Sequence, residues 1–300
     1  MRQMLGTDNK IFTVALLTGS FFIFLFLLLI SYNYFSHGKL ELTSGKPRIA
    51  IVELTGPIYE SRPIIQQFKR FAKDDDIDAI LFRISSPGGG VSASQEIYEE
   101  VRRIRNSGKI IVASMGPMAA SGGYYVALAA NKIMSSPATV TGSIGVIVGL
   151  PNYEGLMKKL GLRFENITSG PRKDSGSPYR KFEADDKKIF QDVVDDLYDQ
   201  FVNAVSLERG ISEERVRELA DGRIYSGSQA KELGLVDTLG TYDDAIDYAV
   251  ELANLTGEPT LIKARKRRPS LIELLFGDAR TLIEILEPTV LPEYKLNVNF

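Results

Sequence analysis

The sequence predicts an α/β fold with a mostly parallel sheet. Two short, predominantly apolar runs, residues 79–87 (AILFRISSP) and 109–116 (KIIVASMG), have the length and composition of buried strands. Between them, residues 92–108 show helical periodicity, with Ser92 as a candidate N-cap and Gly108 as a stop signal. A strand, a helix and a second strand in this order are typical of a parallel sheet covered by helices.

The other elements extend this pattern in chain order. A strand at 48–56 opens the body, and strand-like runs follow at 132–137 and 141–149, after a short helix over about 122–130. Beyond residue 183 the pattern is mainly helical. The helical segments are residues 184–210, 212–222, 226–234 and 241–257.

Composition excludes several classes of function. A chain of 300 residues with 44% hydrophobic residues can bury a sizeable core, and a net charge of −2 disfavours a nucleic-acid-binding protein. Because cysteine is absent, a disulfide framework, a cysteine nucleophile and a thiolate metal site are all excluded. The single histidine, His37, leaves few options for a general base.

An uncharged run at residues 11–30 predicts a transmembrane anchor, because a 20-residue helix spans a bilayer core of roughly 30 Å. A cleaved signal peptide is the alternative, although its apolar region would be shorter. Basic residues lie on both sides of the run, so charge does not decide its orientation. The predicted organisation is a tail (1–10), the anchor, a stalk (31–47), an α/β domain (48–258) and a C-terminal segment (259–300).

The C-terminal segment differs in composition from the domain before it. Residues 263–268 (KARKRR) form a basic cluster, and residues 269–288 carry leucine and isoleucine at helical spacing. A helix packed on the body is one interpretation. A subunit contact or a helix on a membrane surface are the others.

Ser121 is the candidate nucleophile. It lies in AASGG, where small neighbours permit a sharp turn from strand to helix and leave the hydroxyl uncrowded. The amide of Gly122 is a natural oxyanion donor, and the glycine-rich loop SSPGGG (85–90) offers Gly88 or Gly89 as the second donor. A tightly packed helix start and an ordinary turn are the structural alternatives for these two motifs.

The general base must come from a residue other than histidine. His37 lies just beyond the predicted membrane span, outside the domain, so a Ser-His-Asp triad is disfavoured. Lysine is the remaining common choice, provided that burial or nearby positive charge keeps it neutral. Composition does not identify which lysine serves.

Four motifs in order resemble the signal peptide peptidase A family of membrane serine proteases, in its short single-repeat form: SSPGGG, MGPMAASGGYY, TGSIGVI and SGPRKDSGSPYR. The resemblance covers residues 48–255. It implies a fold similar to those of ClpP and crotonase, with repeated strand-strand-helix units. It also implies that Ser121 is the nucleophile, that Lys173 is the base and that Ser143 orients this lysine.

The same resemblance implies an endopeptidase that degrades signal-peptide remnants and other short apolar peptides, without cofactor or metal. Homo-oligomers that share active sites between subunits are expected. So is a location in the inner membrane, held through residues 11–30, with the catalytic domain on the periplasmic or extracellular side. The alternatives are a protease that cuts a stomatin-like membrane protein, a crotonase-like acyl-CoA-binding protein and an inactive scaffold.

Overall fold

The computed structural model describes residues 20, 23–25, 27, 46–264 and 293–295. The chain divides into two compact units, Met1–Lys46 and Pro47–Phe300. In the first unit, residues 20, 23–25 and 27 are helical. Within the described part of the chain, no helix is both long enough and apolar enough to cross a membrane.

Two predictions fall largely on residues that the structure does not describe. Most of the predicted anchor at 11–30 lies outside the described residues, as does the predicted helix at 269–288. Both stay predictions.

The second unit is built on a mixed sheet that confirms the predicted α/β class. The strands run in the order β7-β6-β4-β2-β1-β9, and β5 pairs with both β4 and β8. The pairs are parallel except for β6 with β7. The strands are β1 (Arg48–Thr55), β2 (Ala79–Ser86), β4 (Ile110–Ala120), β5 (Lys132–Ser135), β6 (Val140–Gly142), β7 (Ile224–Ser226), β8 (Thr238–Leu239) and β9 (Thr260–Lys263).

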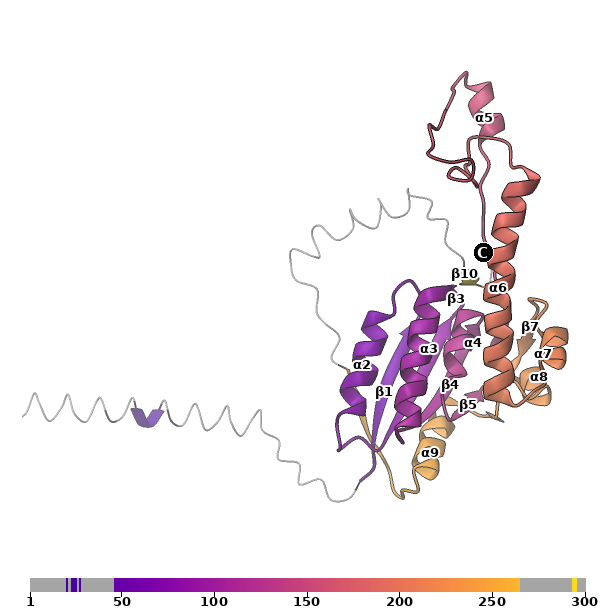
Figure 1. The fold of residues 1–300 in the computed structure, drawn as a ribbon. Helices are drawn as coiled ribbons and strands as arrows, with labels where there is room; N and C mark the ends of the chain where they lie inside the picture. The colour runs from indigo at the N-terminus through magenta and orange to yellow at the C-terminus, as the bar shows by residue number, and fades with distance from the viewer. Residues whose placement is uncertain (1–19, 21–22, 26, 28–45, 265–292, 296–300) are drawn as a thin grey trace, which may run out of the picture. The chain divides into compact units, whose positions relative to one another are not determined.

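Helices cover both faces of the sheet (Figure 1). One face packs against α2 (Arg62–Ala72), α3 (Val91–Asn106), α4 (Gly122–Ala127) and α6 (Ala184–Arg209), and the other against α9 (Tyr242–Leu252). The remaining helices of this unit are α5 (Glu154–Lys159), α7 (Glu213–Leu219) and α8 (Gly227–Glu232).

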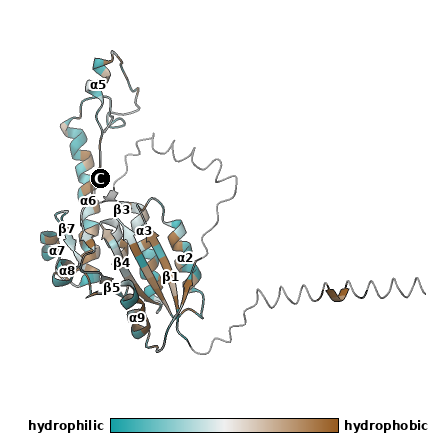
Figure 2. Ribbon diagram, turned by 180° about the vertical axis from the view of Figure 1, so that it is seen from behind, coloured by the Kyte–Doolittle hydropathy of each residue, from teal (hydrophilic) through white to brown (hydrophobic). Residues whose placement is uncertain are grey.

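Strand β1 shows why the central strands are predominantly apolar. Successive side chains point to opposite faces. Ala50, Val52 and Leu54 therefore join the core under α2 and α3, whereas Ile49 and Ile51 join the core under α9. Figure 2 shows the resulting hydrophobic colour along the strands, whereas the helices carry both hydrophobic and hydrophilic residues. A continuous apolar run is thus what a strand buried on both faces requires.

Strand β4 divides its pairing between two neighbours. Its first half pairs with β5 and its last three residues pair with β6. The prediction of a strand at 141–149 was wrong beyond Gly142, because β6 ends there. Ser143, the next residue, has a φ of 50°, which a strand does not accommodate. The turn that replaces the strand lies next to the end of β4.

Residues 150–183, called the arm below, project from the body beyond the first turn of α6 (Figure 1). The arm contains α5 and a series of turns. Most of its large apolar side chains are exposed in the single chain, and α5 buries none of its residues. The exposed apolar residues include Leu156, Leu160, Leu162, Phe164 and Ile167.

Candidate active site

Ser121 occupies a strained turn between β4 and α4. Its φ is 53° and its ψ is −118°, a combination that costs a non-glycine residue of order 1–3 kcal/mol. Two hydrogen bonds hold it there: its N–H donates to the carbonyl of Gly142 at 2.8 Å, and its carbonyl accepts from the N–H of Tyr125 at 2.8 Å. Nucleophilic serines of α/β hydrolases occupy a similar strand-turn-helix.

The hydroxyl of Ser121 has no hydrogen-bond partner among the described residues, although the residue is 0% exposed. Buried hydroxyls are usually paired, so an orphaned one requires an explanation.

The glycines of AASGG are required by close packing against the SSPGGG loop. A Cβ on Gly122 would lie 2.7 Å from Ser94 Oγ and 3.2 Å from both Gly88 Cα and the amide nitrogen of Gly89. A Cβ on Gly123 would lie 2.7 Å from the carbonyl oxygen of Ser86. The structure therefore brings together the two glycine-containing segments whose amides the sequence analysis proposed as oxyanion donors.

Within the SSPGGG loop, the amides of Gly88 and Gly89 have different surroundings. The N–H of Gly88 donates to Ser86 Oγ at 3.1 Å, so this amide is already engaged. The amide nitrogen of Gly89 lies beside Gly122. Of the two donors that the sequence left open, Gly89 is thus the one whose amide adjoins Gly122. Sequence reasoning missed Ser86, whose hydroxyl engages the amide of Gly88 and so distinguishes it from the amide of Gly89.

The loop also forms a short strand, β3 (Gly88–Gly90), with partners on both edges. On one edge Ile58 donates to the carbonyl of Gly88 and accepts from the N–H of Gly90, both at 2.8 Å. On the other edge β10 (Glu293–Lys295) pairs in antiparallel fashion, with Tyr294 opposite Gly89. The glycine loop therefore accepts an extended segment of chain as an added strand, the recognition mode called β-augmentation.

Ser143 is linked to Ser121 through Gly142. It follows Gly142, whose carbonyl binds the N–H of Ser121, and its own N–H donates to the carbonyl of Arg223 at 2.8 Å. Gly142 cannot carry a side chain, because a Cβ there would lie 2.5 Å from the ring of Tyr225. Ser143 also lines a groove of about 520 Å³ with Val146, Tyr198 and residues 220–222.

Lys173 lies on the exposed arm and not in the buried site. Its N–H donates to the carbonyl of Gly170 at 3.2 Å within a run of turns, and the residue is exposed. Within the described part of the chain, its side chain makes no hydrogen bond or ion pair, whether to Ser121, to Ser143 or to any other residue. A single chain thus brings Ser121, Ser143, Gly89 and Gly122 together and leaves Lys173 apart.

The two tyrosines after Ser121 anchor α4 and do not take part in the chemistry. Tyr124 is fully buried, which raises the pKa of its phenol, and it donates to the carbonyl of Leu235 at 2.8 Å. Burial likewise raises the pKa of Tyr125 to about 12, and its ring packs on Tyr98 and Phe201 at 5.0 Å. Neither phenol is therefore a base at neutral pH.

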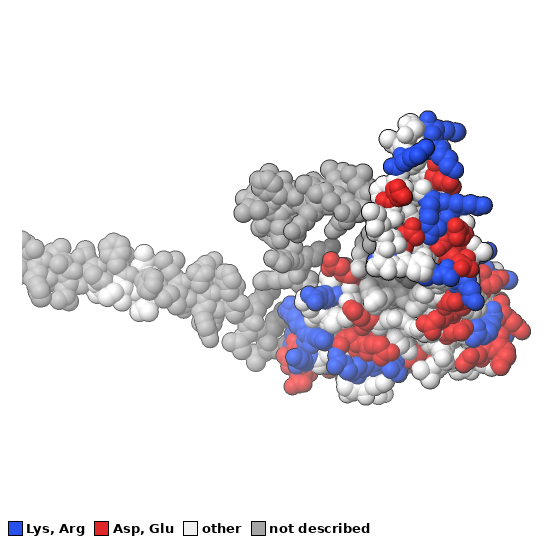
Figure 3. Space-filling model, turned by 45° about the horizontal axis from the view of Figure 1, so that its top comes forward, with Lys and Arg blue, Asp and Glu red and all other residues white. Residues whose placement is uncertain are grey.

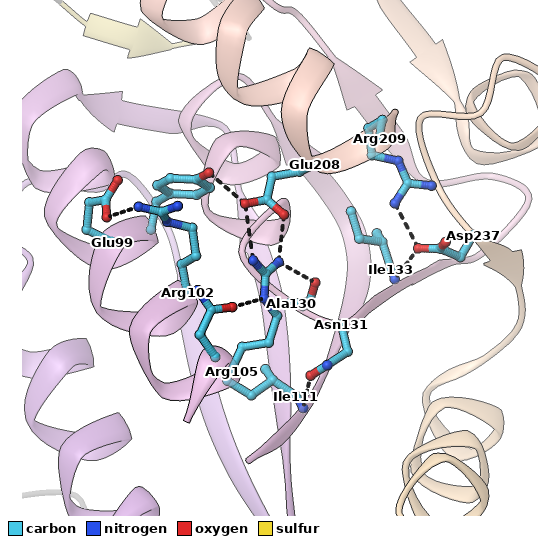
Figure 4. A network of polar contacts seen from close by, with 12 residues as sticks. Glu99, Arg102, Arg105, Ile111, Ala130, Asn131, Ile133, Glu208, Arg209 and Asp237 are labelled. Carbon is cyan, nitrogen blue, oxygen red and sulfur yellow. Dashed lines mark hydrogen bonds and ion pairs between the residues drawn. The ribbon is translucent and has the colours of Figure 1, made fainter. Parts of the chain in front are cut away.

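A polar network braces the helices around α4 (Figure 4). Glu208 of α6 accepts from Tyr98 at 2.8 Å and pairs with Arg105 of α3 at 2.6 Å. Arg105 also donates to the carbonyl of Ala130 at 3.3 Å, just after α4. The network therefore fixes α3 and α6 to the chain that follows α4. Among the described residues no group of three His, Asp or Glu side chains could hold a metal ion.

Sequence comparisons agree with this geometry. Residues 103–256 match the model of peptidase family S49, and residues 46–141 match that of the Clp protease family. A putative protease of Synechocystis is 41% identical over 236 residues, covering 78% of this chain and 85% of the relative. A putative signal peptide peptidase SppA of Enterococcus faecium is 40% identical over 198 residues, which cover 66% of this chain and 58% of that protein. The chain belongs to peptidase family S49 and is a serine protease.

Proposed function

We propose that the protein is an endopeptidase with Ser121 as nucleophile and Lys173 as general base. The observation that carries the proposal is the turn at Ser121, where a strained backbone and a buried hydroxyl without a partner adjoin the amides of Gly122 and Gly89. Acyl transfer needs a nucleophile beside two donors aimed at the developing oxyanion.

The reaction follows from these groups. Ser121 Oγ attacks the carbonyl carbon of the scissile peptide while the Nζ of a neutral lysine takes the hydroxyl proton. The amides of Gly122 and Gly89 bind the oxyanion of the tetrahedral intermediate, a contribution of about 10²–10³ in rate for each donor. The lysine then gives the proton to the leaving amine. A water molecule attacks the carbonyl carbon of the acyl-enzyme while the neutral lysine takes a proton from it, and the lysine returns this proton to Ser121 Oγ as the ester bond breaks.

The base reaches Ser121 from a neighbouring copy of the chain. Three features support this part of the proposal: the unpaired hydroxyl of Ser121, the exposed position of Lys173, and the apolar side chains on the arm, among which Leu160 is 62% and Ile167 fully exposed. A large exposed apolar surface indicates an interaction site. When the arm packs on a neighbour, its apolar side chains are buried and Lys173 can approach Ser121 and Ser143.

The substrate binds as an extended strand along Gly88–Gly90. Support comes from β10, which pairs with this edge within the chain itself. Beside Gly90 lies a groove of about 600 Å³, lined by Tyr59, Leu197 and the start of α3, which offers space for substrate side chains. Short apolar peptides, including signal-peptide remnants, suit such an edge. An anchor at residues 11–30, with the catalytic domain outside the inner membrane, would place it near these substrates.

Covalent labelling tests the two catalytic assignments. The full chain in detergent is treated with a fluorophosphonate probe, and the labelled residue is located by mass spectrometry. Labelling at Ser121 is expected, with loss in Ser121→Ala and Lys173→Ala. Lys159→Ala is the matched control, because Lys159 is also an exposed lysine of the arm. Labelling that persists in Lys173→Ala would reject the lysine assignment.

Mixing inactive subunits tests the shared site. Ser121→Ala and Lys173→Ala chains are each inactive alone. If one chain supplies the serine and its neighbour the lysine, random co-assembly restores about one quarter of the sites. Mixtures that remain inactive, while wild-type chains treated in the same way recover full activity, would show that each site takes both residues from one chain.

A further inference from the structure

Arg180 holds together the part of the arm that carries Lys173. Its guanidinium donates to both carboxylate oxygens of Asp174, from Nε at 3.1 Å and from Nη2 at 3.2 Å. Nη2 also donates to the backbone carbonyl of Asp174 at 3.1 Å. The residue directly after Lys173 is therefore fixed by its backbone as well as by its side chain.

The other side of the guanidinium is tied to the first turn of α6. It donates to both oxygens of Asp186, from Nη1 at 2.5 Å and from Nη2 at 3.0 Å. Asp186 is only 3% exposed, and it caps α6 by accepting from the N–H of Glu183 at 3.1 Å. The hydrogen bonds from Arg180 hold the pKa of Asp186 far below its usual range, and those from the two carboxylates raise the pKa of Arg180. The loop that carries Lys173 is thus held to the start of α6 through Arg180.

The same contacts decide which charges are available to Lys173. The charged groups around this loop come from the loop itself and from the start of α6, and Figure 3 shows charges of both signs interleaved on the arm. Asp174 is occupied by Arg180, and Asp185 by Arg172 at 2.8 Å. Lys173 has no ion pair within the described part of the chain. The carboxylate that directly follows Lys173 and the carboxylate of Asp185 are therefore both paired with arginine.

This arrangement matters because a general-base lysine must lose its proton. An unpaired carboxylate beside an ammonium favours the charged form and opposes proton loss. Arg180 is shared between Asp174 and Asp186, so it offsets part of the charge of the Asp174 carboxylate and fixes the direction of that carboxylate. A lysine in place of Arg180 would be a point charge without this bidentate geometry.

We propose that Arg180 is a positioning residue for catalysis, which fixes the loop carrying Lys173 and keeps the carboxylate of Asp174 from pairing with that lysine. The inference rests on the proposed role of Lys173 as base. It gives Asp174 and Arg180 distinct effects on the pH dependence of the reaction, which a purely structural clamp would not have.

The test compares pH profiles of kcat/KM for four full-length proteins: wild type, Arg180→Gln, Asp174→Asn and the double variant. Arg180→Gln frees the Asp174 carboxylate, so the acid limb of the profile is expected to move to higher pH by about one unit. Activity on the acid limb then falls about tenfold at a given pH. The double variant lacks the carboxylate as well, so its acid limb is expected to return to the position in the wild type, with a reduced kcat because the loop is less well fixed.

Arg180→Lys supplies the conservative variant. It keeps a positive charge near Asp174, so the acid limb should return most of the way, while the loss of the fork keeps kcat below that of wild type. Circular dichroism and light scattering on every variant establish that fold and assembly are retained.

The outcomes separate the two proposals. If Lys173→Ala retains activity, the base assignment fails and the role of Arg180 fails with it. If Lys173→Ala is inactive but Arg180→Gln and the double variant share one acid limb, Lys173 remains the base and Arg180 is only a structural clamp. Should the folded Arg180→Gln variant match wild type in both kcat and pH profile, the inference about Arg180 is likewise overturned.

Discussion

The glycine loop allows a sharp test of oxyanion geometry through Gly89→Ala. A Cβ on Gly89 would lie 2.3 Å from the carbonyl oxygen of Ile58 and 2.5 Å from its nitrogen. Side chains do not approach backbone atoms closer than about 3.0 Å, so the strand must shift by at least about 0.7 Å. The clashing atoms belong to the backbone of Ile58, which two hydrogen bonds hold to this loop. We therefore expect β3 to move and to carry the amide of Gly89 with it.

A shift of this size affects rate more than stability. Misplacing a catalytic group by about 1 Å costs about 10²-fold, and losing one oxyanion donor costs about 10²–10³. We therefore expect kcat of Gly89→Ala to fall about 100-fold, while overpacking lowers the free energy of unfolding by about 1–3 kcal/mol. Hydrolysis of a fluorogenic peptide measures the first quantity, and urea denaturation measures the second.

Gly90→Ala is the matched control, one residue further along the same strand. A Cβ there meets the carbonyl oxygen of Ile58 at 3.6 Å, an ordinary contact, and the φ of Gly90 is −57°, which alanine adopts freely. Its kcat should stay within about threefold of wild type. Equal losses in the two variants, or near wild-type kcat in Gly89→Ala, would refute the argument that the position of this amide limits the rate.

Three further predictions concern binding and stability. Deleting residues 293–300 removes β10 from the peptide-binding edge, so KM for a short peptide should fall with kcat unchanged; an unchanged KM in steady-state kinetics would contradict this. Tyr124→Phe leaves the buried carbonyl of Leu235 without its donor, which should cost about 1–3 kcal/mol in urea denaturation, whereas a loss below a few tenths would show that the carbonyl is otherwise satisfied. Arg180 lowers the pKa of Asp186 in the folded protein. The wild type should therefore be more stable to unfolding than Asp186→Asn, and this difference should be complete above about pH 5, because the carboxyl group in the unfolded chain has a pKa of about 3.9. It should disappear as the pH falls through the folded pKa, so unfolding curves at several pH values that show a constant difference would reject this linkage.

The sheet and its helices were predictable because they depend on local pattern. The runs at 79–87 and 109–116 are predominantly apolar, which is what burial on both faces demands, and both became central strands. The turn at Ser121 was also visible, since glycine and alanine surround it. The strand predicted at 141–149 was wrong beyond Gly142, because the apolar pattern carries no sign of the left-handed backbone at Ser143.

Parts of the candidate site depend on contacts between distant residues, which the sequence does not display. The pairing of Gly89 with Tyr294 joins positions about 200 residues apart. The exposed apolar side chains of the arm follow no regular spacing, so the sequence does not predict which surface they contact. Nothing in the sequence distinguishes Arg180 from the other arginines, because its ion pairs with Asp174 and Asp186 form only in the folded arm.

The backbone of Ser121 has an evolutionary consequence. At φ 53° and ψ −118° a serine is strained, but glycine has no Cβ and occupies this mirror-image region readily. A mutation to glycine would therefore relieve the strain and give a more stable protein that cannot attack a peptide. On the proposed mechanism, stability alone thus favours an inactive protein at this position, and the requirement for turnover keeps the serine there. Lineages freed from that requirement would be expected to lose their nucleophile first and their fold last.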